Sequence, residues 1–149
     1  MFLYAVLLVT CTVLCTYAAL DLKGMTKTKL AELEAKKMSE CLKKFGVNIT
    51  TLSGYLNEES NNTTKEFKCV LGCFTEEMGY GKDNKPLWDI MEEVHKIEYE
   101  TKEDKEKALK IVETCKTIVP EEAEDSCELG FAMHSCYTAQ ARKLGLTLE

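Results

Sequence analysis

Six cysteines in the body of the chain are spaced so that they could form covalent crosslinks between distant segments. They are Cys41, Cys69, Cys73, Cys115, Cys127 and Cys136. The intervals between them hold 27, 3, 41, 11 and 8 residues. Two further cysteines, Cys11 and Cys15, lie in an apolar segment at the start of the chain. An even set of cysteines outside that segment indicates three disulfides formed in an oxidising compartment.

Two rival uses of these side chains fit the sequence poorly. A zinc site needs close pairs of cysteine or histidine, and nothing completes a tetrahedron around the neighbours His134 and Cys136. A secreted phospholipase needs a histidine followed by aspartate, but His134 precedes a serine and His95 precedes a lysine. Two histidines at these places also support no Ser-His-Asp arrangement. We therefore expect neither a metal, a cofactor nor an enzymatic activity.

The first eighteen residues are predicted to be a secretory signal peptide. The first twenty residues are apolar and uncharged, and small side chains at Thr16 and Ala18 occupy the positions that a signal peptidase reads. No basic cluster follows to stop transfer, which disfavours a membrane anchor, although no lysine or arginine precedes the apolar run either. The mature domain is therefore expected to cover residues 19–149, to be extracellular and not to insert into a membrane.

Charge and length restrict the partners of the mature domain. The chain has 149 residues, enough for one domain, and a net charge of −6 with lysines interleaved among glutamates. No basic face emerges from this mixture, so nucleic acid is an unsuitable partner. An acidic and charge-rich surface is typical of a highly soluble extracellular protein.

The elements that carry the cysteines are expected to be helices throughout. Apolar residues recur at helical spacing, only two prolines occur, and no stretch alternates long enough for a confident strand. The expected fold is an all-α, compact bundle of about six helices. These helices lie at about 27–45, at 51–56, between Thr63 or Thr64 and Gly79, from Pro86 through Ile97, from Thr101 to before Pro120, and from Pro120 to about Arg142.

Start and stop signals set several of these boundaries. Gly46 and Gly79 are expected to end the helices before them, with a turn-rich loop at 80–85. Thr101 begins a sequence that resembles a capping box. Pro120 is expected to break one helix and begin the next, with two glutamates favourably placed in its first turn.

Helix geometry limits which cysteines can pair. Cys69 and Cys73 are four residues apart and lie on one face of a helix, about 40° apart around its axis. Cys127 and Cys136 are nine residues apart and point to opposite sides of theirs. Spacing therefore disfavours a bridge within either pair. The fifteen pairings that six cysteines allow are not otherwise reduced.

The complete set of intervals resembles that of the insect odorant-binding protein family, in its six-cysteine, pheromone- and general-odorant-binding group. The three residues between Cys69 and Cys73 and the eight between Cys127 and Cys136 are the family's spacings. The other intervals are within its range, and the run at 68–79 is also similar. The resemblance covers the whole mature chain. Saposin-like proteins, which also have six cysteines, differ because they start with a paired C-x2-C.

The resemblance implies both a disulfide pairing and a function. The implied pairs are Cys41–Cys73, Cys69–Cys127 and Cys115–Cys136. The implied function is that of a secreted carrier, which binds small hydrophobic molecules such as odorants, pheromones or similar lipophilic ligands in an internal apolar cavity. A chemosensory receptor is a further candidate partner, and the protein is either a monomer or a homodimer. The alternative is an extracellular interaction or toxin-like protein with a filled core and no small ligand.

Apolar side chains around the implied crosslinks are the candidates for lining the cavity. They are Val70, Leu71, Phe74, Met78, Trp88, Met91, Val94, Ile111, Phe131 and Met133. Two tyrosines, Tyr80 and Tyr137, could offer a hydroxyl to the polar end of a ligand. The alternative for each aliphatic residue is ordinary core packing. The final residues of the tail after the last cysteine alternate apolar and polar, and Leu144, Leu146 and Leu148 are expected to fold back and wall the cavity.

Two remaining features bear on modification and on pH. Sequons place possible glycosylation at Asn48, Asn61 and Asn62, although the threonines after them could equally cap a helix. The two histidines, His95 and His134, could sense a change of pH, although a solvated histidine with no role is the simpler interpretation.

Overall fold

A computed structural model describes residues 20–50 and 64–148 of the chain. Within these residues five helices and one small hairpin follow one another: α1 Lys27–Phe45, α3 Lys65–Glu77, β1 Gly81–Lys82, β2 Lys85–Pro86, α4 Trp88–Glu98, α5 Lys102–Ile118 and α6 Ser126–Leu144. The all-α class is therefore confirmed, with five described helices where about six were expected. The predicted signal peptide and the predicted short helix at 51–56 fall outside the described residues. None of the described helices is long and apolar enough to cross a membrane.

Polar caps decide where most of the helices begin. The side chains of Thr26, Thr64, Thr101 and Asp125 each accept a hydrogen bond from the backbone N–H three residues further on. Each bond satisfies one of the donors that a helix start leaves free. The predicted box at Thr101 is confirmed, because its hydroxyl also donates to Oδ2 of Asp104 at 2.7 Å. Thr64, one of the two expected caps, starts α3.

The predicted helix starts at the two prolines are wrong. Pro86 lies in β2, opposite Gly81, and α4 begins two residues later at Trp88. The hairpin takes over this stretch because Asp83 and Asn84 both adopt positive φ, the conformation that its tight turn requires. Pro120 is followed by a loop rather than a helix, and α6 starts only at Ser126.

That loop is held against the hairpin instead of winding into a helix. The backbone N–H of Ala123 donates to the carbonyl oxygen of Asn84 at 2.9 Å, and Lys85 forms an ion pair with Glu122 at 3.1 Å. A loop that hydrogen-bonds to a neighbouring segment pairs its backbone N–H and C=O groups without forming a helix. The cap Asp125 then starts α6 where this contact ends.

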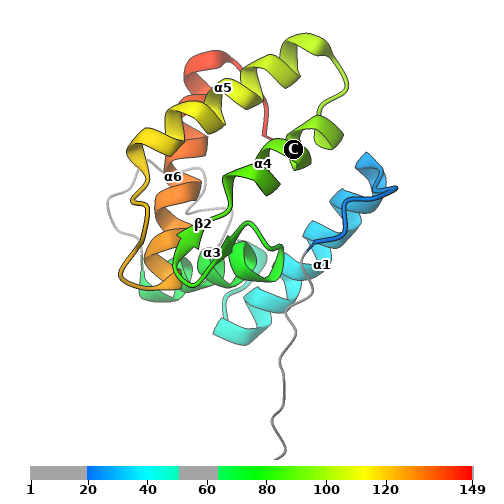
Figure 1. The fold of residues 1–149 in the computed structure, drawn as a ribbon. Helices are drawn as coiled ribbons and strands as arrows, with labels where there is room; N and C mark the ends of the chain where they lie inside the picture. Colours follow the sequence, from blue (N-terminus) through cyan, green and yellow to red (C-terminus); the bar gives the residue numbers. More distant parts are fainter. Residues whose placement is uncertain (1–19, 51–63, 149) are drawn as a thin grey trace, which may run out of the picture.

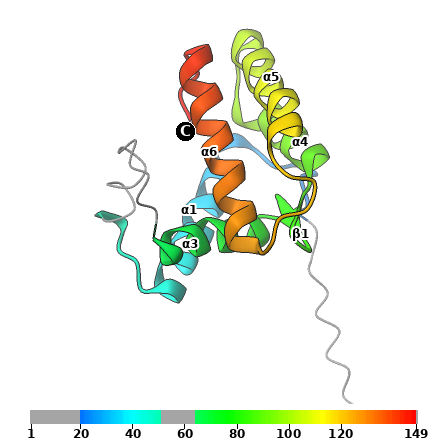
Figure 2. The same ribbon diagram turned by 90° about the vertical axis from the view of Figure 1, so that its left-hand side faces the viewer.

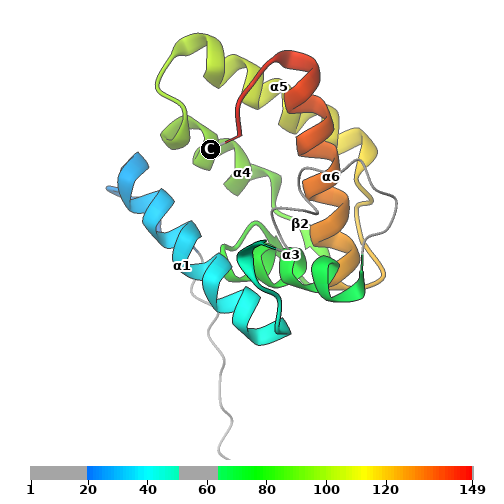
Figure 3. The same ribbon diagram turned by 180° about the vertical axis from the view of Figure 1, so that it is seen from behind.

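Helix α6 connects the two ends of the helical bundle. Helices α3 and α5 lie at opposite ends of the molecule, and α6 runs between them (Figure 1). Turned by 90°, α6 crosses α3, and α4 and α5 lie beside one another (Figure 2). From behind, α1 and α4 lie on the side away from α6 (Figure 3). The sides of the bundle are thus formed by α1, α4 and α6, and one end by α3 (Figure 1, Figure 3).

Three disulfides tie these helices together. Cys41–Cys73 joins α1 to α3, Cys69–Cys127 joins α3 to α6, and Cys115–Cys136 joins α5 to α6, with Cα–Cα distances of 5.8, 4.1 and 5.9 Å. These are the pairs that the family resemblance implied. Cys69 does not pair with Cys73, and Cys127 does not pair with Cys136, which agrees with the helix geometry that disfavoured both bridges.

The crossing of α3 over α6 is unusually close because two glycines meet there. A Cβ atom added to Gly130 would overlap the backbone of Gly72, and one added to Gly72 would overlap the carbonyl of Ser126. Glycine lets two backbones approach to a distance that any side chain would prevent. This contact brings Cys69 and Cys127 together and sets the angle at which α6 rises from α3.

Candidate functional site

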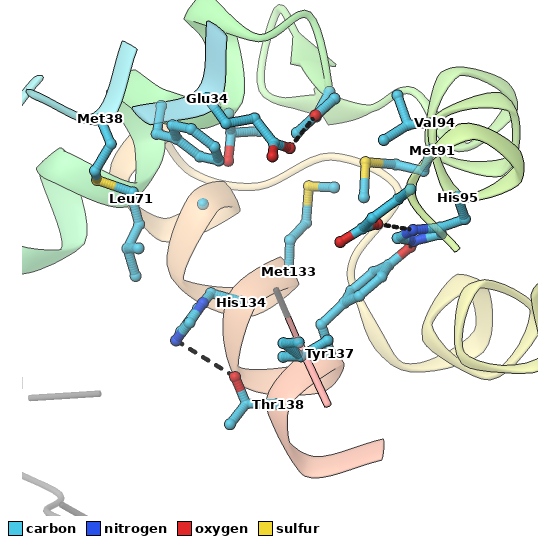
Figure 4. Close-up of a pocket in the computed structure, with 16 residues that line it drawn as sticks. Glu34, Met38, Leu71, Met91, Val94, His95, Met133, His134, Tyr137 and Thr138 are labelled. Atoms are coloured by element: carbon cyan, nitrogen blue, oxygen red, sulfur yellow. Dashed lines mark hydrogen bonds and ion pairs between the residues drawn. The ribbon is translucent and has the colours of Figure 1, made fainter. Parts of the chain in front are cut away.

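An apolar cavity of about 480 Å³ lies among α1, α3, α4 and α6 (Figure 4). Its walls are apolar over most of their area, although eight of the sixteen lining residues carry a polar group. The lining residues are Glu34, Met38, Leu71, Phe74, Thr75, Tyr80, Met91, Val94, His95, Glu98, Gly130, Met133, His134, Tyr137, Thr138 and Leu148. A hollow of this size holds a small organic molecule.

About half of the residues proposed from the sequence line this cavity. They are Leu71, Phe74, Tyr80, Met91, Val94, Met133, Tyr137 and Leu148. They come from α3, the loop after it, α4, α6 and the tail, so the fold brings together residues far apart in the sequence. Met133 lies near the middle of the cavity, between Glu34 and His95 (Figure 4).

The other proposed residues lie outside this cavity because they pack between elements. Met78 and Ile111 are fully buried in the main core, and Trp88, Leu144 and Leu146 pack in or against the same core. Val70 belongs to a second cluster between α1 and α3, and Phe131 packs against that cluster. The ring of Phe131 also lies 4.8 Å from the ammonium of Lys68. Core packing is the alternative that the sequence had left open for the aliphatic side chains among them.

Half of the lining escaped the sequence analysis. The missed residues are Glu34, Met38, Thr75, His95, Glu98, Gly130, His134 and Thr138. A signal for one of them was present, since Glu34 interrupts a stripe of apolar residues four apart, between Leu30 and Met38. A charged residue within an apolar stripe is unusual and marks a buried polar contact or a site.

The polar groups of the cavity form three sets, of which one is the 3.4 Å contact between the Thr138 hydroxyl and Nε2 of His134 (Figure 4). The Tyr80 hydroxyl donates to Oε1 of Glu34 at 2.6 Å. Nδ1 of His95 bonds Oε2 of Glu98 at 2.7 Å, and its Nε2 lies 3.3 Å from the Tyr137 hydroxyl. The ring of His95 is buried, at 5% exposure, so these partners satisfy its nitrogens away from water.

Burial governs the ionisation of several lining groups. It raises the pKa of both Tyr80 and Tyr137, so their hydroxyls stay neutral at any physiological pH. It also raises the pKa of Glu34, although the Tyr80 hydrogen bond opposes this. The pKa of His134 is lowered, first by burial and then by the positive charge of Arg142. His134 therefore lines the cavity as a neutral side chain at pH 7.

The tail returns over the cavity after α6 ends. Gly145 reverses the chain at φ 61°, and the backbone N–H of Leu146 donates to the Ala141 carbonyl at 3.0 Å. The Tyr99 hydroxyl donates to the carbonyl of Thr147 at 3.4 Å, which holds the tail beside the end of α4. The tail is the red segment that runs back toward α4 in Figure 1. Leu148 lines the cavity and is 40% exposed, so it lies at a boundary between the cavity and solvent.

Replacing Leu148 by aspartate is expected to weaken the binding of an apolar probe by about tenfold, because a charged wall disfavours an apolar ligand. The probe is N-phenyl-1-naphthylamine, whose fluorescence rises in apolar surroundings, and the measurement is a titration. Leu87→Asp is the matched control, because Leu87 is 37% exposed and lies outside the cavity lining. Equal affinities for the two variants would show that the tail takes no part in binding.

One of the three possible glycosylation sites lies in the described residues. Asn48 is exposed, two residues after Gly46, the C-cap of α1. Asn61 and Asn62 fall outside the described residues. Occupancy of these sites stays a prediction.

Helices crosslinked by three disulfides around an apolar cavity define a class of small, covalently tied all-α domains. Residues 23–140 match the PBP/GOBP family. Two solved structures have the same fold. The odorant-binding protein dmelOBP28a from Drosophila melanogaster is 23% identical, with a TM-score of 0.64 over 81% of this chain and 99% of its own. The odorant-binding protein lmigOBP1 from Locusta migratoria is 24% identical, with a TM-score of 0.56 over 79% and 83%.

No curated protein matches the chain. The family match nevertheless covers most of the sequence, and the disulfides and the fold agree with it. The chain belongs to the PBP/GOBP family, the pheromone- and general-odorant-binding proteins. The resemblance deduced from the cysteine intervals is thereby confirmed.

Proposed function

We propose that the protein is an extracellular carrier, which holds a small hydrophobic molecule in the cavity among α1, α3, α4 and α6. The observation that supports this best is the cavity itself, about 480 Å³ in volume with mainly apolar walls. A small domain normally fills its centre, because empty space costs stability. A cavity retained in a crosslinked domain is therefore understood best as a place for a ligand.

The covalent ties explain how such a cavity can persist. The three disulfides tie α1, α3, α5 and α6 together, so three of the four helices that line the cavity are crosslinked. The fourth, α4, contains no cysteine and is held by packing against α5. Crosslinks of this kind each contribute roughly 3–4 kcal/mol in the chain-entropy account. The stability gained from the disulfides compensates for the packing contacts that are lost where the core is not filled. Secretion through the predicted signal peptide would supply the oxidising compartment in which they form.

The flexible and weakly polar walls suit more than one ligand shape. Methionine side chains adapt to varied surfaces, and Met38, Met91 and Met133 all lie in the lining. The carrier role requires no covalent chemistry. We infer a binding protein rather than an enzyme, with release to a receptor or to the surrounding fluid as its final step.

Replacing Met133 by tryptophan tests the carrier proposal. The larger ring would occupy the middle of the cavity, so the affinity for N-phenyl-1-naphthylamine is expected to fall by at least about tenfold. The matched control is Ile118→Trp, which adds the same side chain at a residue that is 58% exposed and outside the lining. Circular dichroism checks that both variants keep the fold.

The proposal fails if the unmodified protein binds neither the probe nor any member of a panel of long-chain alcohols, esters and fatty acids. That result would favour the alternative of an extracellular interaction protein that uses the scaffold without a small ligand. An equal loss of affinity in the two tryptophan variants would place the probe outside this cavity.

A further inference from the structure

The charged groups that face the cavity are mostly of one sign. Glu34 from α1 and Glu98 from α4 both lie in the lining, whereas none of the described lining residues is a lysine or an arginine. The two carboxyl groups are within electrostatic reach of each other, since the charge of Glu98 contributes to the raised pKa of Glu34, after burial. His95 is the only base bonded to either of them among the described residues. Two carboxyl groups therefore meet one histidine at this end of the cavity, and acidic groups outnumber basic ones there.

The same end has free acceptors but few free donors. The Tyr80 hydroxyl already donates to Oε1 of Glu34, and the structure gives Oε2 no donor among the described residues. The Tyr137 hydroxyl is already paired with His95. Since a carboxyl group has two oxygens with several acceptor positions, Glu34 can accept further hydrogen bonds while it keeps the one from Tyr80.

The remainder of the cavity fits a hydrocarbon chain. Leu71, Phe74 and Met91 line it beside Val94 and Met133, and each of these five side chains is apolar. A molecule lying against them places its polar end near Glu34 and Glu98. There an ammonium group would meet acceptors and opposite charge, whereas a carboxylate would meet like charge, and the hydroxyls of Tyr80 and Tyr137 are already paired.

We propose that the cavity prefers apolar molecules that end in a primary ammonium group, and rejects carboxylates of the same length. This inference rests on the carrier function proposed above and names the ligand class of the same site. Glu34 and Glu98 are the specificity-determining residues, and the apolar walls supply the affinity that all ligands of the same length share.

The test compares three ligands that differ only in the polar end. Decylamine, decanol and decanoate displace N-phenyl-1-naphthylamine at pH 7.4, each below its critical micelle concentration. We expect decylamine to bind at least about tenfold more tightly than decanoate, with decanol between them. Native mass spectrometry with decylamine checks that one ligand binds per chain.

Glu34→Gln and Glu98→Gln identify the source of the preference. Each change removes one charge at nearly constant shape, and the amide oxygen of glutamine still accepts from Tyr80 at position 34. Each is expected to reduce the ratio of amine to carboxylate affinity by at least about threefold, while decanol affinity changes by less than about twofold. Glu124→Gln is the matched control, since it changes the net charge equally at an exposed position outside the lining.

Three results would overturn the inference. Equal affinity for decylamine and decanoate would show that the cavity does not select for charge. The preference for the amine could also survive in both Glu34→Gln and Glu98→Gln, or fall equally in Glu124→Gln. Either result would show that the preference comes from the overall surface charge. In both cases decanol still displaces the probe and the carrier function stands. Failure of the probe and of all three ligands to bind would instead refute the carrier function, and the inference with it.

Discussion

Replacing Gly130 by alanine is expected to destabilise the protein by about 3 kcal/mol or more. At an ordinary helical position this change would stabilise by up to about 1 kcal/mol, because alanine is the better helix former. Here the added methyl group would overlap the backbone of Gly72 on the neighbouring helix, which has no side chain that could move aside. The two helices must separate, and overpacking of a buried contact costs about 1–3 kcal/mol and occasionally more.

The measurement is urea unfolding followed by circular dichroism, and Gly46→Ala is the matched control. Gly46 has a φ of 66° and open space around its missing side chain, so the control reports backbone strain alone, roughly 1–2 kcal/mol. A gain in stability for Gly130→Ala, or a loss no larger than that of the control, would contradict the close crossing of α3 and α6. Because Gly130 also lines the cavity, probe affinity should fall together with stability.

The second large effect is expected from removing the Cys69–Cys127 disulfide by changing both residues to alanine. The bridge closes a segment with a sequence separation of 58 residues. In the chain-entropy account its loss destabilises the protein by roughly 4 kcal/mol, because the unfolded chain regains freedom. The total free energy of unfolding of a native domain is only about 5–15 kcal/mol, so the variant should unfold at a much lower temperature.

A double substitution at Cys115 and Cys136 provides the comparison. That bridge has a sequence separation of 21 residues, and the same account gives a loss of roughly 3 kcal/mol. Both variants are measured by urea unfolding at equal protein concentration. A loss below about 1 kcal/mol for the Cys69–Cys127 pair would show that packing at the glycine crossing holds α3 to α6 without help from the crosslink.

Local features of the sequence predicted the helices well, but failed where a tertiary contact competed. The 27–45 helix and the caps at Thr64 and Thr101 follow from spacing and side-chain chemistry within one turn, and the structure has them. The helix starts predicted at Pro86 and Pro120 were wrong because a proline begins a helix only where the backbone around it does not hydrogen-bond to another segment. At Pro86 the hairpin does so, and the loop after Pro120 bonds to Asn84.

The amino-acid sequence by itself determined the helical class, the crosslinking chemistry and, through the cysteine intervals, the family. Each of these depends on residue type and on distance along the chain. Only the tertiary structure decided which apolar side chains face the cavity. Met78 and Met133 are both buried methionines on or next to helices, yet only Met133 faces the cavity, because that depends on what lies across from each side chain. That Glu34 and Glu98, from separate helices, line the same cavity is likewise decided by the tertiary packing, since nothing along the chain records which distant residues will meet.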